Sequence, residues 1–163
     1  MKQWIWSNRY DIAIASGIFV VALLPRVLGL GTFLTADEKN WMGRSYEFVR
    51  AFKDLRLNEM LQTTHPGAIP LWLMGVSITA KIFLSHTPFS FQTLPNFIIA
   101  AQLPIALLNS LAVPAMYILL RIVCKRYVSG LAQYLLPGVA AIFVALDSFI
   151  IGYSKVAHVD ATL

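Results

Sequence analysis

The chain has 163 residues, of which 58% are hydrophobic and 13% are charged, with a formal net charge of +5. Soluble domains average about 25% charged residues and have less than half apolar residues, so this composition excludes an ordinary soluble domain. The 13 basic residues are scattered, which argues against a nucleic-acid-binding surface; in a membrane protein they mainly report topology. The single cysteine, Cys124, cannot form an internal disulfide.

The first predicted element is a membrane-spanning helix over residues 12–31. The preceding residues include Lys2 and Arg9, which resembles the charge layout of a signal peptide. No small-residue cleavage site follows, because the apolar run leads directly to Arg26. We therefore expect a retained membrane anchor.

An outer loop is predicted over residues 35–96, and it opens with the sequence TADEKNW. Thr35 and Glu38 have the spacing of a capping box, and Asp37 suits the first turn of a helix. The adjacent carboxylates also suit a catalytic base and its partner. The following residues predict an amphipathic helix that lies in the headgroup plane with its apolar face toward the membrane. That face comprises Trp41, Ser45, Phe48, Phe52 and Leu55.

The next apolar stretch, residues 66–84, opens with prolines 66 and 70 and Gly67 and carries Lys81 near its end. We expect it to lie along the interface without crossing. Residues 97–120 and 128–153 are the second and third predicted spans, each about as long as a membrane requires. Asp147 interrupts the third span and is expected to be satisfied by a helix-ending contact.

Loop charges support this arrangement. Residues 121–127 contain Arg121, Lys125 and Arg126 and no acidic residue, so the positive-inside rule places that loop and the N-terminus in the cytoplasm. With three spans, both assignments hold, and Asp37, Glu38, His65 and Asp160 share the outer face. The predicted fold is therefore an all-α polytopic membrane protein with three transmembrane helices and outer-face juxtamembrane helices, with four transmembrane helices as the alternative.

The ionisable residues near the span ends have two interpretations. Arg26 and Lys155 either extend toward the headgroups or bind a phosphate. His65, before a proline, is either a loop residue or a ligand. The chain also ends with His158 and Asp160 close to Lys155. No metal-binding spacing or glycine-rich phosphate loop occurs.

Three segments together resemble a known family. TADEKNWMGRSYEFVRAF, TTHPGAIPLWLMG and LDSFIIGYSKVAHVDATL are similar in order and spacing to the N-terminal part of polyprenyl-phosphate-dependent glycosyltransferases of the membrane C-type fold. The resemblance is to the family 39-like group of protein O-mannosyltransferases and aminoarabinose transferases. It covers residue 12 to the end. Because such proteins are several times longer, we expect the chain to be an N-terminal fragment that is inactive alone.

The resemblance also implies residue roles. Asp37 would be the catalytic base, Glu38 its positioning partner, and Asp160 a second acidic residue of the site. Lys155 stands where the family has arginine; it keeps the charge but loses the two-pronged geometry for phosphate. The remaining candidate contacts with the carrier phosphate or substrate are His65, Arg26 and His158.

The implied reaction is an inverting sugar transfer at the extracytoplasmic face of the inner membrane. The donor would be a polyprenyl-phosphate sugar and the acceptor a hydroxyl of a protein or lipid. Asp37 and Glu38 could also hold a divalent metal, although nothing in the sequence requires one. Two other readings stay open: a transporter or channel whose ion path uses Asp147, Lys155 and Asp160, and a non-catalytic membrane scaffold.

Overall fold

The computed structural model describes residues 9–61 and 68–158. Within these residues the chain forms six α-helices and two short 3₁₀ helices, which confirms the predicted all-α class. His65 and Asp160 lie outside the described residues. The elements, in chain order, are α2 (Arg9–Val27), α3 (Glu38–Lys53), η1 (Leu57–Met60), α4 (Ala68–Ser85), η2 (Leu94–Phe97), α5 (Ile98–Tyr127), α6 (Ala132–Leu146) and α7 (Ser148–Ser154).

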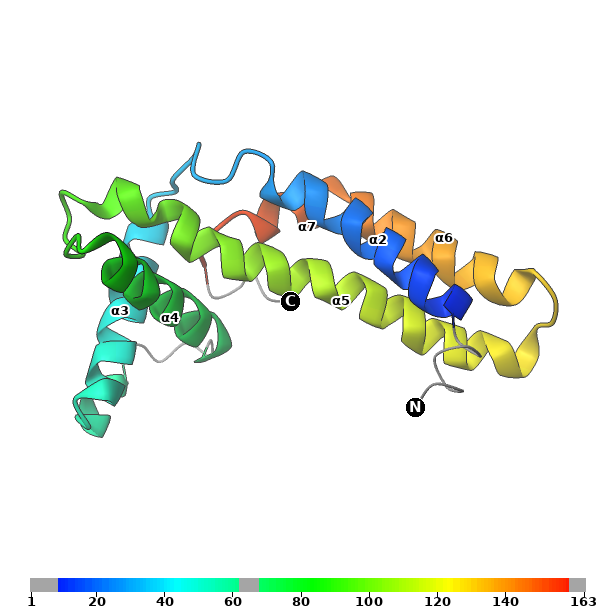
Figure 1. The fold of residues 1–163 in the computed structure, drawn as a ribbon, viewed down its shortest axis with the longest axis horizontal. Helices are drawn as coiled ribbons and strands as arrows, with labels where there is room; N and C mark the ends of the chain where they lie inside the picture. Colours follow the sequence, from blue (N-terminus) through cyan, green and yellow to red (C-terminus); the bar gives the residue numbers. More distant parts are fainter. Residues whose placement is uncertain (1–8, 62–67, 159–163) are drawn as a thin grey trace.

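Three helices form a bundle along the long axis of the molecule. Figure 1 shows α2, α5 and α6 side by side, with α3 and α4 gathered at the end where α5 begins. The bundle is held by a small apolar core that each of the three helices supplies. The residues of this core are Ile18, Ala22, Val113, Tyr117, Ala141 and Ala145.

A second, larger core lies at the end of the bundle where α3 and α4 pack. It includes Met42, Met74, Phe97 and Ala101, all fully buried, and reaches Ala157 near the C-terminal end of the described residues. Helix α5 belongs to both cores. Its 30 residues extend about 45 Å, which is longer than the roughly 30 Å hydrocarbon core of a bilayer. One continuous helix therefore links the bundle to the α3–α4 pair.

Helices α3 and α4 approach each other closely. The rings of Phe48 and Phe52 contact the ring of Trp72, with centroids 5.1 and 4.9 Å apart. A Cβ atom at Gly75 would lie 2.2 Å from the backbone oxygen of Ser45. The apolar face of α3, expected to lie against the headgroups, is thus largely covered by α4. Leu55, just past the helix, remains 80% exposed.

Three described segments are long and apolar enough to cross a membrane: Arg9–Val27, Ala68–Ser85 and Leu94–Tyr127. Helices α6 and α7, bent by 58° at Asp147, would together make a fourth. The number of spans agrees with the prediction of three or, as the alternative, four. The helices that qualify differ from those predicted. Helix α4 is long and apolar enough to span, and the predicted third span, residues 128–153, is divided into the two helices α6 and α7.

Contacts between α2 and α5 limit the topology. The Gly31 backbone N–H, shortly after α2, donates to the Gln102 side chain near the start of α5, at 2.9 Å. The end of α2 and the start of α5 therefore lie at one end of the bundle, and an even number of crossings separates them. Either α3 and α4 both cross the membrane or neither does. Because α3 is rich in charged residues, it is poorly suited to cross, and we therefore favour an α4 that packs beside the bundle end without crossing.

Candidate functional site

The loop before α3 forms the expected capping box. The Thr35 backbone N–H donates to Glu38 Oε2 at 2.6 Å, and the Glu38 backbone N–H donates to Thr35 Oγ1 at 3.3 Å. This reciprocal pair satisfies two donors at the helix start. The structural interpretation of the Thr-x-x-Glu spacing is confirmed, and it fixes the position of the intervening Asp37.

Glu38 does more than cap the helix, because its side chain is completely buried. Its Oε1 accepts hydrogen bonds from Gln102 Nε2 at 2.8 Å and from the Ala157 backbone N–H at 2.7 Å. The Glu38 carboxylate therefore accepts from three donors: the neighbouring Thr35 N–H, the Gln102 amide on α5 and the Ala157 N–H near the C-terminal end of the described residues. A buried charge that accepts several N–H donors can be retained at a tolerable cost.

Gln102 completes this arrangement from α5. It is 2% exposed, and its Nε2 also donates to the Phe33 carbonyl at 3.1 Å while its Oε1 accepts from the Gly31 N–H. One amide thereby holds both the loop after α2 and the Glu38 carboxylate. Sequence reasoning missed Gln102; its only signal is that it is one of two amides in an otherwise apolar window.

A cavity of about 300 Å³ lies next to the capping box, with Thr35 in its wall. Asp37 lines it from the α3 side, and Tyr153 and His158 line it from α7 and the segment that follows. Asp37 itself is exposed. Two residues that the sequence proposed for the site, Asp37 and His158, therefore share one cavity, although 121 positions separate them in the sequence.

Aromatic and basic side chains extend this region. The Trp41 ring meets the His158 ring edge-on, with centroids 5.2 Å apart. The Arg44 guanidinium lies 4.8 Å from the centre of the Trp41 ring, a cation–π arrangement. Arg44 is thus a cation near the cavity that sequence reasoning did not select.

Arg26 is placed differently from either sequence interpretation. It is completely buried and neither extends to the headgroups nor faces the cavity lined by Asp37. Its guanidinium donates to the carbonyls of Ala145 at 2.9 Å and Val144 at 3.5 Å, in the last turn of α6. It also donates to Ser154 Oγ at 3.3 Å. Arg26 therefore satisfies carbonyls that the break at Asp147 leaves without helical partners.

Asp147 and Lys155 mark the two ends of α7. The Asp147 carboxylate accepts from the Ile150 N–H at 2.9 Å and caps the helix start, as expected for a helix-ending contact. Lys155 Nζ donates to the Leu28 carbonyl at 2.8 Å. These contacts tie α7 to the end of α2 and thereby position the segment that carries His158.

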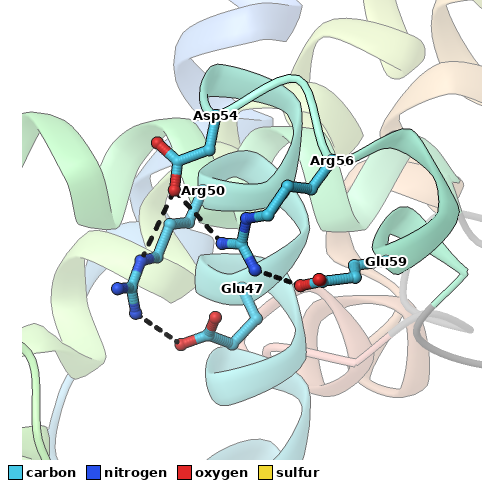
Figure 2. A network of polar contacts seen from close by, with 5 residues as sticks. All are labelled: Glu47, Arg50, Asp54, Arg56 and Glu59. Atoms are coloured by element: carbon cyan, nitrogen blue, oxygen red, sulfur yellow. Dashed lines mark hydrogen bonds and ion pairs between the residues drawn. The ribbon is translucent and has the colours of Figure 1, made fainter.

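The remaining outer charges pair among themselves. Figure 2 shows Arg50 between Glu47 and Asp54, at 3.6 and 3.9 Å, and Arg56 in contact with both Asp54 and Glu59. These ion pairs are largely exposed, so each contributes little to stability. None of the five residues lines the cavity beside Asp37.

The described residues contain no group of three or more His, Cys, Asp or Glu side chains suited to hold a metal. Of the acidic residues expected to form the site, the structure places Asp37 and Glu38 at one end of the bundle, together with the chain up to His158. The predicted roles of His65 and Asp160 concern positions outside the described ranges.

Comparisons of the chain with protein-family models, curated proteins and solved structures found no match.

Proposed function

We propose that this chain is the N-terminal part of a membrane glycosyltransferase that moves a sugar from a polyprenyl-phosphate carrier to an acceptor hydroxyl. The observation that carries the proposal is the cavity that both the exposed Asp37 and His158 line, next to the capping box of the buried Glu38. An exposed carboxylate beside a membrane-spanning bundle can accept the proton of a hydroxyl that attacks the sugar.

The proposal gives each residue a distinct task. Asp37 acts as the general base, and Glu38 holds the loop in place. Lys155 and His158, together with Asp160, supply the polar groups of the C-terminal segment, where a basic side chain stabilises the charge that develops on the leaving phosphate. His65 is proposed to contact the carrier or substrate. Arg26, shielded in this structure, supports the site by fixing α7 and gives no direct phosphate contact.

The proposed location is the extracytoplasmic side of the inner membrane. Residues 121–127, predicted as a loop, are the last turns of α5, and they lie at the opposite end of the bundle from Asp37 (Figure 1). Clusters of basic residues at span ends favour the cytoplasm, so the cavity is proposed to open on the other side. A sugar donor linked to a lipid fits this location, since it needs no nucleotide there.

The test uses the full-length protein, expressed from its native gene in membrane vesicles. Vesicles receive polyprenyl-phosphate mannose or polyprenyl-phosphate aminoarabinose with a radiolabelled sugar, and label is counted in the lipid-donor and acceptor fractions. Asp37→Asn should lower transfer by about 100-fold or more, the usual contribution of a general base.

The matched control is Asp54→Asn, which makes the same chemical change within the outer ion-pair network of Figure 2. It should leave transfer within about twofold of wild type, because exposed ion pairs contribute little. Equal transfer by wild type and Asp37→Asn would overturn the assignment of the base. No transfer from either donor by the wild-type protein would overturn the proposed reaction with these carriers.

A further inference from the structure

Gln102 occupies a place where only an amide satisfies all of its neighbours. Its Nε2 faces two acceptors, the Phe33 carbonyl and Glu38 Oε1, and its Oε1 faces one donor, the Gly31 N–H. A glutamate would place an oxygen against both acceptors. A leucine would remove the partner that Gln102 gives to the Gly31 N–H and to the Phe33 carbonyl, and would remove one of the two donors to Glu38 Oε1. Because the site is buried, either change removes hydrogen bonds that water cannot easily replace.

The same contacts form a chain between two parts of the cavity wall. Gln102 holds the loop of residues 29–38 and the Glu38 carboxylate, and Glu38 in turn accepts from the Ala157 N–H. Ala157 is fully buried and directly precedes His158, which lines the cavity opposite Asp37. Gln102 has no direct hydrogen bond to Ala157 among the described contacts, so any influence on that segment passes through Glu38.

We infer that Gln102 is a positioning residue that, through Glu38, holds the Asp37 loop and the His158 segment in fixed positions relative to each other. This inference rests on the proposed function for its catalytic meaning, because it concerns how the general base is held. Its structural content, the coupling of two distant segments through one amide, can be measured without any assay of sugar transfer.

The measurement is hydrogen–deuterium exchange of the full-length protein in detergent, with rates corrected for intrinsic pH dependence. Gln102→Leu should accelerate exchange by roughly tenfold or more in residues 29–38, which it contacts, and also in residues 153–158, which it does not. Gln133→Leu makes the same chemical change on α6, at an amide whose oxygen accepts from Arg121, and should leave both segments within about twofold of wild type. Unchanged exchange in residues 153–158 of Gln102→Leu would overturn the inference.

Gln102→Glu supplies a second test that survives if the leucine variant fails to fold. The new carboxylate places an oxygen against both the Phe33 carbonyl and Glu38 Oε1, so residues 29–38 and residues 153–158 should both exchange roughly tenfold faster than in the wild type, or more.

Faster exchange in both residues 29–38 and residues 153–158 of Gln102→Glu supports the inference. Wild-type exchange rates in residues 153–158 of this variant overturn it. Sugar transfer separates the two proposals: if no carrier supports transfer but the exchange coupling is found, the proposed function fails and the positioning role stands. If Asp37→Asn abolishes transfer and Gln102 variants change neither exchange nor transfer, the proposed function stands and the positioning role of Gln102 fails.

Discussion

At the scale of single residues, buried polar groups decide how this end of the molecule is built. The Thr35–Glu38 capping box and the helix-ending role of Asp147 could be predicted from the sequence, because both act within a few positions of themselves. The contacts of Gln102 and most of those of Arg26 could not be predicted, because the partners lie 64 to 128 residues away. A sequence pattern shows the side chain but gives no indication of which distant carbonyl or carboxylate will face it.

Arg26 gives a prediction about stability. Arg26→Leu leaves the Val144 and Ala145 carbonyls of α6 without their buried donors, so the free energy of unfolding should fall by about 1–3 kcal/mol. Denaturant titration in detergent, followed by circular dichroism, measures the change.

Lys155→Met is the control for this substitution, since Lys155 has one contact with a backbone carbonyl and lies at a more exposed position. Its loss should be smaller, about 0.5–1 kcal/mol. Equal losses for the two variants would show that the α6 carbonyls do not depend on Arg26.

At the scale of helices, the α3–α4 pair shows where periodicity was informative and where it was not. The spacing of Trp41, Ser45 and Phe48 correctly predicted one buried face of α3. The sequence could not identify α4 as a partner of that face, because a lipid surface and an apolar helix demand the same pattern of side chains. The signal that distinguishes them is Gly75, whose missing side chain lets the two backbones approach.

Gly75 therefore tests the helix pair. In Gly75→Ala the new methyl group would meet the Ser45 backbone oxygen and the Val49 side chain, so the helices must separate. We expect a loss of about 1–3 kcal/mol in unfolding free energy, measured by denaturant titration.

The comparison is Gly43→Ala on α3, where a Cβ atom meets nothing within 4 Å. That change should stabilise the protein by about 0.5–1 kcal/mol, because alanine favours a helix interior more than glycine does. A neutral or stabilising effect of Gly75→Ala would mean that α3 and α4 are not in close contact.

At the scale of the whole molecule, the two apolar cores divide the chain into a bundle and an outer end joined by α5. The sequence predicted this division through loop charges and the prolines near residue 66. The computed fold adds that Gly31 and Gln102 meet, which ties the end of α2 to the start of α5 without reference to charge. The sequence showed that residues 66–84 are apolar enough to span, but it could not show that α4 packs against α3.

Cys124 offers a test of this topology, since it is the only cysteine in the chain and lies near the end of α5 away from Asp37. A membrane-impermeant maleimide added to intact cells should leave Cys124 unlabelled. In a Cys124→Ser background, Gly43→Cys on α3 should be labelled rapidly, because its side chain faces open space. Rapid labelling of Cys124 from outside would contradict the cytoplasmic placement of residues 121–127 and, with it, the outer placement of the Asp37 end of the bundle.

The position of Arg26 also has a consequence for biosynthesis. Its acceptors at Val144 and Ala145 leave the ribosome 118 and 119 residues later, so the newly made α2 carries a cation that can reach only the Ala22 carbonyl of its own helix. An arginine that lacks most of its partners is drawn toward the aqueous boundary of the bilayer. The buried contacts of Arg26 are therefore completed only when α6 packs against α2.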